Sequence, residues 1–241
     1  MKRSTALIIA LVLSAPAAAA DAPVLSLNLG GGATLAQPLR IVLLLTVLAL
    51  LPAIVIAMTS FTRTIIVLSM LRHAFGMQDT PPNMVLLSMA LFLTVFTMAP
   101  AIQEINQTSL QPLLQEKIDL QTAVEHGVAP LRAFMVRQTR EKDLALILQV
   151  AHAPAPESID AVRTVHIVPA FLLSELKTAF QIGFMIFLPF LLLDLVVASV
   201  LMSMGMLMVP PTIISLPLKV LMFVLIDGWA LVVRSLLGSF H

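Results

Sequence analysis

The sequence predicts an all-α membrane protein, built from long, broken apolar helices in hairpins and a polar helical region between them. Of its 241 residues, 59% are hydrophobic and only 11% are charged. A soluble domain is nearer one half apolar and about one quarter charged. Four apolar segments each approach the ~20 residues that cross a bilayer core. The polar region repeats its apolar residues at spacings of three and four, which is typical of helices, and shows no strand-like alternation.

Residues 1–20 have the pattern of a cleavable secretory signal. Lys2 and Arg3 precede an apolar stretch that is too short to span a bilayer comfortably, and an alanine run ends just before Asp21. The alternative is an uncleaved first helix, but Pro16 and the alanines favour processing. Cleavage would leave the new N-terminus outside the cytoplasm of a bacterium.

The rest of the chain divides into four parts. Residues 21–38 form a linker, because three consecutive glycines and a proline oppose regular structure. Residues 39–101 hold the first two apolar helices with a loop between them, residues 102–180 the polar helical region, and residues 181–241 the last two apolar helices. The apolar segments run over about 39–58, 84–99, 182–201 and 216–237.

The stretch between the first two apolar segments indicates the topology. Its charges are Arg63, Arg72 and Asp79, so it is short and net positive. The positive-inside rule therefore predicts a cytoplasmic loop. The polar region 102–180 is then periplasmic, and the last loop turns back toward the cytoplasm.

Charged residues interrupt the last two apolar segments. Asp194 and Lys219 lie within them, followed by Asp227, and a charge at the bilayer centre costs about 2.5–3.5 kcal/mol on insertion scales. Lys219 could instead snorkel to the interface, which the short, central Asp194 does poorly. We expect these segments, with their several prolines, to face protein or a water-filled channel. Glu175, Asp194 and Asp227 are candidate partners for Lys219, and spacing does not choose among them.

The loop before the last apolar segment is rich in methionine. In "SVLMSMGMLMVPP", residues 199–211, methionine occupies alternate positions from Met202 to Met208, with Gly205 in the middle. Period two does not make a stripe on a helix, but it suits an extended loop that shows its methionines to one side. The first half can still end the preceding helix. The alternative is that these flexible side chains pack a membrane core.

No pattern of catalysis, cofactor binding or metal binding is found. There is no cysteine, no phosphate-binding glycine loop and no nucleophile elbow. The histidines lack metal-ligand spacing; they are His73, His126, His152, His166 and His241. We expect no enzyme, and the formal charge of +1 predicts no nucleic-acid partner.

Three long stretches carry a family resemblance. They are "MTSFTRTIIVLSMLRHAFGMQDTPPN" (58–83), "PAFLLSELKTAFQIGF" (169–184) and "VPPTIISLPLKVLMFVLIDGW" (209–229). They resemble the FliP family of bacterial flagellar type III export proteins, whose virulence-secretion relatives are the SctR proteins. The similarity covers about residues 40–238, and the cleavable signal favours the flagellar branch.

The resemblance implies a closed helical pore in the bacterial inner membrane, at the flagellar basal body. In this family, five copies assemble with FliQ and FliR, with FlhB and FlhA nearby, and unfolded flagellar subunits pass through. Glu175 and Lys219 match the family's acidic and lysine positions, which implies contacts between neighbouring subunits; Asp194 is a weaker third candidate.

The methionine loop matches the family's pore gasket. Here the gasket corresponds to Gly205, Met206, Leu207 and Met208. Two other functions stay open: a scaffold that templates assembly of the export apparatus without lining the path, and a small-solute or ion transporter. Transporters usually show internal symmetry, and the sequence shows none.

Overall fold

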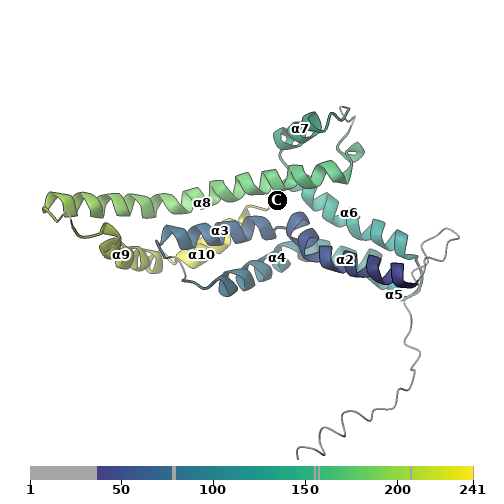
Figure 1. The fold of residues 1–241 in the computed structure, drawn as a ribbon, viewed down its shortest axis with the longest axis horizontal. Helices are drawn as coiled ribbons and strands as arrows, with labels where there is room; N and C mark the ends of the chain where they lie inside the picture. The colour runs from purple at the N-terminus through teal and green to yellow at the C-terminus, as the bar shows by residue number, and fades with distance from the viewer. Residues whose placement is uncertain (1–36, 78–79, 155, 157, 207, 241) are drawn as a thin grey trace, which may run out of the picture. The chain divides into compact units, whose positions relative to one another are not determined.

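The computed structural model describes residues 37–77, 80–154, 156, 158–206 and 208–240, and every regular element in them is helical (Figure 1). The predicted signal and all but the last two residues of the predicted linker lie outside the described residues. In chain order the elements are α2 (Gln37–Met58), α3 (Phe61–Ala74), α4 (Asn83–Ile105), the π-helical turn η1 (Asn106–Leu110), α5 (Gln111–Leu114), α6 (Leu120–Gln138), α7 (Glu141–Val150), the 3-10 turn η2 (Ile159–Ala161), α8 (Thr164–Ser203), α9 (Pro211–Leu225) and α10 (Gly228–Gly238).

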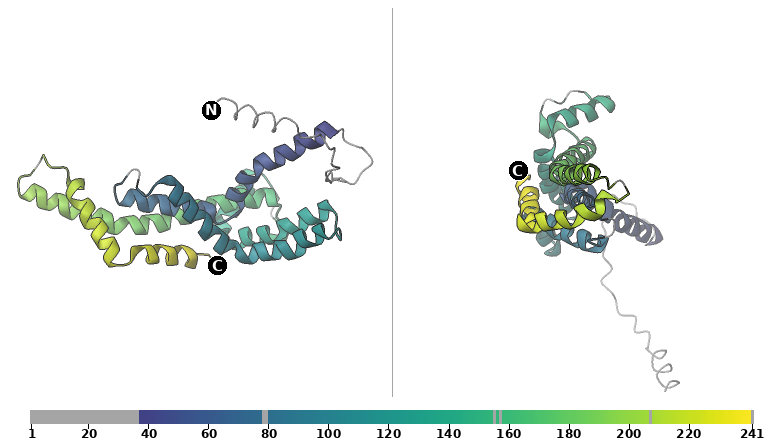
Figure 2. Two further views of the ribbon diagram at one scale, coloured as in Figure 1. Left: turned by 90° about the horizontal axis from the view of Figure 1, so that it is seen from below. Right: turned by 90° about the vertical axis from the view of Figure 1, so that its left-hand side faces the viewer.

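The long helix α8 organises the fold. It runs for 40 residues and contacts α3, α6, α7, α9 and α10 (Figures 1 and 2). Gly183 lets α3 approach closely, because a Cβ atom there would lie 2.2 Å from the sulfur of Met70. Because α8 spans Thr164–Ser203, the third predicted segment, 182–201, is only the second half of this helix. The expected end of the polar region at residue 180 falls inside this helix.

Two pairs of helices are bent. Residues 48–58 of α2 meet α3 at 70°, and α9 meets α10 at 66°. The fourth predicted segment, 216–237, is thus two helices. At their junction Asp227 adopts the left-handed conformation, with φ of 52°, and a Cβ atom on Gly228 would lie 2.1 Å from the ring of Phe223. Glycine is required there for this close turn.

Most prolines of the apolar segments do not interrupt their helices. Of the five prolines expected to interrupt them, Pro52, Pro189 and Pro217 lie inside continuous helices, whereas Pro210 and Pro211 do stand at the start of α9. Each proline removes only one backbone donor, and the rest of the ladder holds the helix together. The break in the last apolar segment occurs instead at Asp227.

Proline suits the first turn of a helix, so Pro130 favours a helix start at that position, but the polar helix α6 begins ten residues earlier, at Leu120. Its N-cap is Asp119, whose carboxylate accepts a hydrogen bond from the Thr122 backbone N–H at 3.3 Å. Hydrogen bonds from the Thr122 hydroxyl and backbone hold the pKa of Asp119 below its usual value. Capping at Asp119 places Pro130 in the helix interior.

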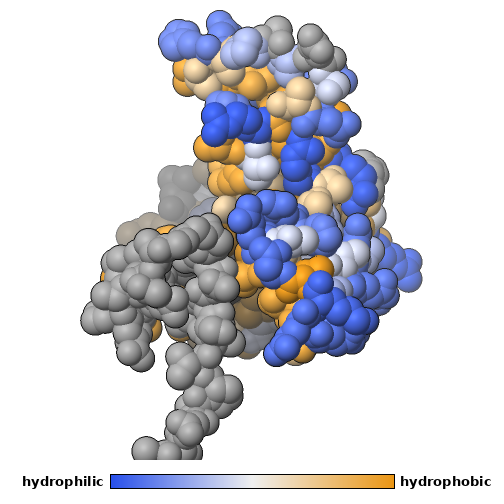
Figure 3. Space-filling view, turned by 90° about the vertical axis from the view of Figure 1, so that its right-hand side faces the viewer, coloured by the Kyte–Doolittle hydropathy of each residue, from blue (hydrophilic) through white to orange (hydrophobic). Residues whose placement is uncertain are grey.

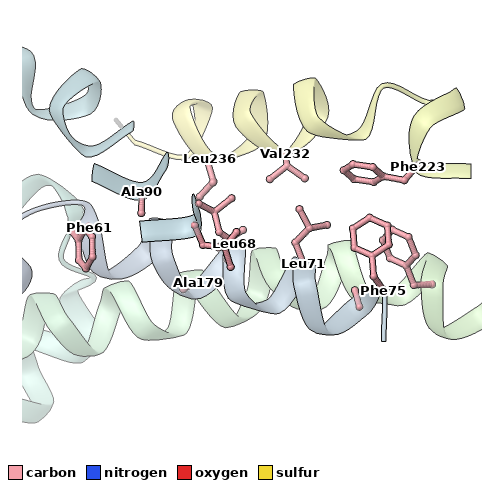
Figure 4. Packing of buried hydrophobic residues seen from close by; sticks show 13 residues of the cluster. Phe61, Leu68, Leu71, Phe75, Ala90, Ala179, Phe223, Val232 and Leu236 are labelled. Carbon is pink, nitrogen blue, oxygen red and sulfur yellow. The ribbon is translucent and has the colours of Figure 1, made fainter. Parts of the chain in front are cut away.

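Two clusters of buried apolar residues hold these helices. The first cluster joins α3, α4, α8, α9 and α10 (Figure 4). At one end the ring of Phe75 lies 5.0 Å from that of Phe190 and 4.9 Å from that of Phe223. The second cluster joins α4, α6, α7 and α8, and comprises Met98, Ala101, Phe134, Met135, Leu144, Val162, Ile167, Ala170 and Phe171. Each large side chain buried in this way stabilises the fold by about 1.5–3 kcal/mol.

Much apolar surface stays exposed on the long helices. Phe92 and Phe96 on α4 are 72% and 75% exposed, and Met185 on α8 is 74% exposed. Among the described residues two helical stretches, Asn83–Leu114 and Thr164–Ser203, are long and apolar enough to span a membrane, or up to four spans if each bent pair counts as one. Hydrophilic residues gather instead over the end formed by α5, α6 and α7 (Figure 3). This division suits a membrane-embedded protein with one polar end.

Candidate gate loop and buried ion pairs

Gly205 ends α8 with a Schellman turn. Its φ is +76°, its N–H donates to the Met202 carbonyl at 3.0 Å, and the Met206 N–H donates to the Leu201 carbonyl at 3.0 Å. These two bonds satisfy carbonyls that would otherwise lack partners at the helix end. The glycine therefore reverses the chain at a defined place, the end of α8.

The methionines around this turn point outward. Met202 lies in the last turn of α8 and Met204 is its C-cap, so the first half of the run does end the helix. Met206 is 39% exposed and Met208 is 97% exposed. Leu207, the remaining predicted gasket residue, lies outside the described residues. The described methionines of this run are thus available for contact and do not fill the core.

Lys219 takes Asp194 as its partner. Its Nζ donates to Asp194 Oδ2 at 2.7 Å and to the backbone carbonyl of Ala74, at the end of α3, at 3.0 Å. Lys219 is only 4% exposed, whereas the Asp194 side chain is 32% exposed. The pair ties α9 to α8 and so closes the hairpin that carries the methionine loop. Asp227 is exposed at the α9–α10 bend and has no such role.

Glu175 pairs with Arg63. Arg63 Nε donates to Glu175 Oε2 at 2.9 Å, and Nη2 donates to Oε1, which forms a two-pronged contact. Glu175 is 0% and Arg63 is 2% exposed. Arg63 Nη2 also donates to Gln138 Oε1 of α6 at 3.1 Å. Planar arginine suits such bidentate pairing, and burial makes each partner depend on the other.

Sequence reasoning missed Arg63 because it treated this residue as a loop charge. It lies in the first turn of α3 and is among the largest fully enclosed side chains. Arg72 is also helical, and its Nη1 donates to Asn83 Oδ1 at 2.5 Å. The sequence did contain a sign of this pair. Arg63 lies beside an apolar stretch and Glu175 lies within another, and a charge buried in such a stretch requires a partner.

A third buried acid joins α7 to α8. Asp143 is 1% exposed and accepts hydrogen bonds from Lys177 Nζ at 2.5 Å and Ser174 Oγ at 2.8 Å. Burial alone would raise the pKa of Asp143, but these bonds and the charges of Lys177 and Arg140 together hold it below its usual value. This cluster fixes the polar end of the chain on α8.

The described residues contain no group of three or more His, Asp or Glu side chains placed to hold a metal ion. Their buried charges form pairs that join helices, and the methionine loop presents apolar side chains. The site is therefore built from packing and ion pairs.

Fold and site together define an α-helical protein with apolar helices of membrane-span length and an exposed methionine turn. The FliP family model matches residues 44–236. The chain is 56% identical over 201 residues to the flagellar biosynthetic protein FliP of Bacillus subtilis, covering 83% of this chain and 91% of that protein. It is 52% identical to the protein of the same name from Pectobacterium carotovorum, covering 88% and 82%. The Aquifex aeolicus protein is 44% identical, covering 96% and 97%. The chain belongs to the FliP family.

Proposed function

We propose that this chain is a pore-forming core subunit of the flagellar type III protein export gate. Its family and the names of its relatives support a role in flagellar protein export. Its exposed apolar helices support a place in the membrane. In this proposal the membrane is the bacterial inner membrane at the flagellar basal body, with the polar α5–α7 end on the periplasmic side.

The observation that carries the channel proposal is the outward-facing methionine turn. Met206 and Met208 extend from a loop held by the Gly205 turn at one end and by Pro210 and Pro211 at the other. Methionine is unbranched and polarisable, so it adapts to irregular partners. A ring of such loops from several copies would seal against ions at rest and deform around varied unfolded flagellar subunits.

The assembly that we propose contains five copies, with FliQ and FliR in the pore and FlhB and FlhA nearby. Exposed apolar residues of α4 and α8 would then cover one another between subunits. Asp194, one-third exposed beside Lys219, is positioned to contact a neighbouring copy. Glu175 is enclosed with Arg63, so it would support the subunit interface by shaping α8.

Cross-linking tests whether the methionine loops converge. The sequence has no cysteine, so Met208→Cys introduces a single thiol at a side chain that is 97% exposed. In the assembled complex we expect oxidation to give disulfide-linked dimers of this chain. Val150→Cys is the control, since Val150 is 69% exposed on α7, away from both the loop and the α4 and α8 surfaces proposed to pack between subunits. Equal cross-linking at the two positions would remove the support for convergence.

The strongest alternative is a scaffold that templates the export apparatus without lining its path. It predicts normal assembly and no convergence of Met208 thiols. A small-solute or ion transporter, the third possibility, predicts uptake of a solute without any dependence on flagellar substrates.

A further inference from the structure

The two residues after α10, Ser239 and Phe240, contact the buried side chain of Arg63, which is far away in the sequence. We call them the α10 tail. Arg63 Nη1 donates to the Ser239 carbonyl at 2.7 Å and to its hydroxyl oxygen at 2.9 Å. The guanidinium carbon of Arg63 lies 3.9 Å from the centre of the Phe240 ring, which is the geometry of a cation–π contact.

The α10 tail completes the hydrogen bonding of Arg63. A guanidinium carries five N–H donors and no acceptor. Nε and Nη2 donate to Glu175 and Gln138, whereas within the described residues Nη1 donates only to Ser239. Without the tail, a charged group that is 2% exposed would have unpaired donors, which is costly in a dry environment.

The α10 tail also connects the two hydrophobic clusters. Val232 and Leu236 of α10 belong to the first cluster. Phe240 packs against the second cluster, where its ring centre lies 6.3 Å from that of Phe134 on α6. The chain passes from one cluster to the other within four residues of Leu236, so the tail is the place where α10 is joined to α6.

The position of α10 makes this contact relevant to the whole last hairpin. Helix α9 starts after the methionine loop, and α10 follows it. Together they run back along α8 to the tail (Figure 2). Lys219 fastens the first of these helices to α8 and to the end of α3. Arg63 fastens the second through the tail, at the opposite end of α3.

We infer that the α10 tail is a latch, held by the charge of Arg63, that locks the bent α9–α10 pair onto α3 and α6. Arg63 is then a positioning residue that acts through Ser239 and Phe240. These contacts lie within one chain and do not depend on whether the methionine loop gates a channel.

A thiol in the tail measures whether the latch is closed. Ser239→Cys places a single, half-buried thiol beside Arg63 in a chain that has no other cysteine. In the full-length protein in detergent, we expect Phe240→Ala to raise its maleimide labelling rate about tenfold, the equivalent of about 1.4 kcal/mol. Phe240→Trp keeps an aromatic face over the guanidinium and should change the rate less than about twofold.

Removing the buried charges tests whether the charge of Arg63, and not apolar packing alone, holds the tail. The same Phe240→Ala comparison is repeated with Arg63→Met and Glu175→Met, which leave no charge unpaired. The tail should then label quickly already, and Phe240→Ala should add less than about twofold. A full tenfold effect in this background would show that packing alone holds the tail and would overturn the inference. If the double variant does not fold, the Phe240→Ala and Phe240→Trp comparison decides, and equal rates for these two contradict the latch.

Discussion

Lys219 on α9 donates a 2.7 Å hydrogen bond to Asp194 on α8 and thereby closes the hairpin that presents the methionine turn. The same ammonium group binds the Ala74 carbonyl at the end of α3. One buried cation thus sets the positions of three helices near the loop, and an apolar residue could not replace these contacts.

Replacing Lys219 with methionine should therefore loosen the hairpin. Lys219→Met leaves Asp194 and the Ala74 carbonyl without their donor, and we expect a loss of about 1–3 kcal/mol in the free energy of unfolding. This value is smaller than for a fully buried pair because Asp194 is 32% exposed. Thermal unfolding of the purified chain in detergent measures it. Lys219→Arg is the control, since it keeps the charge; equal stability of the Met variant and the parent would exclude the proposed tie.

Breaking the Arg63–Glu175 pair should be more damaging. Arg63→Met leaves a carboxylate that is 0% exposed without its partner, and we expect a loss of about 3–5 kcal/mol. Adding Glu175→Met should recover much of it, because an apolar pair replaces the ionic one. The measurement is the unfolding midpoint of the single and double variants. No recovery in the double variant would mean that the two residues are not energetically coupled.

A charge swap between Glu175 and Lys219 should fail to restore assembly. The family resemblance implies contacts between subunits for both residues, but within this chain Glu175 pairs with Arg63 and Lys219 pairs with Asp194. We therefore expect Glu175→Lys combined with Lys219→Glu to assemble no better than Glu175→Lys alone. Native mass measurement of the detergent-extracted particle reports the result. Recovery of the oligomer by the swap would instead indicate direct pairing of the two residues between subunits.

The conformation of Gly205 makes a further prediction. A Cβ atom at Gly205 would contact nothing within 4 Å, but φ is +76°, so Gly205→Ala meets only backbone strain of about 1–2 kcal/mol. Gly205→Asn should cost less, since asparagine tolerates this conformation. Gly238→Ala is the matched control, because it also meets nothing within 4 Å and lacks the positive φ. Similar unfolding midpoints for the Ala variants at 205 and 238 would contradict the Schellman turn.

Asp143 should make the polar end sensitive to acid. Its pKa is held below the usual value despite burial, so protonation is harder in the folded chain than in the unfolded chain. The stability that it contributes is fully present above the unfolded pKa, about 3.9, and is lost as pH falls through the lower folded pKa. Asp143→Asn should reduce this acid dependence, which unfolding midpoints measured between pH 6 and pH 3 would reveal. An unchanged pH profile in the Asn variant would rule out the linkage.

Local sequence patterns predicted the helices better than the positions at which the helices break. Composition and helical spacing predicted an all-helical chain, and the apolar segments coincide with parts of α2, α4, α8, α9 and α10. Pro52, Pro189 and Pro217 were misleading, because a proline in a packed helix removes only one hydrogen bond. The real break at Asp227 depends on how closely Gly228 approaches Phe223, which is a tertiary contact that spacing does not reveal.

Sequence patterns likewise predicted which charged residues of the candidate site need partners, but not which partners they take. The burial of Lys219 and its need for an acid follow from its place in an apolar segment. The choice of Asp194 over Glu175 and Asp227 does not, because it depends on the packing of α9 against α8. Arg63 and Glu175 are 112 positions apart, so only the folded chain brings them together.

Ion conductance tests the central claim most directly, that Met206 and Met208 seal a channel. The double variant Met206→Ala, Met208→Ala should assemble normally but leak ions across the inner membrane, because two side chains per copy no longer fill the constriction. Met84→Ala with Met185→Ala is the control, since both methionines are more than 70% exposed and lie outside the loop. The account predicts leak in the loop variant alone. Unchanged leak and unchanged flagellar export in that variant would contradict the gate and favour the scaffold.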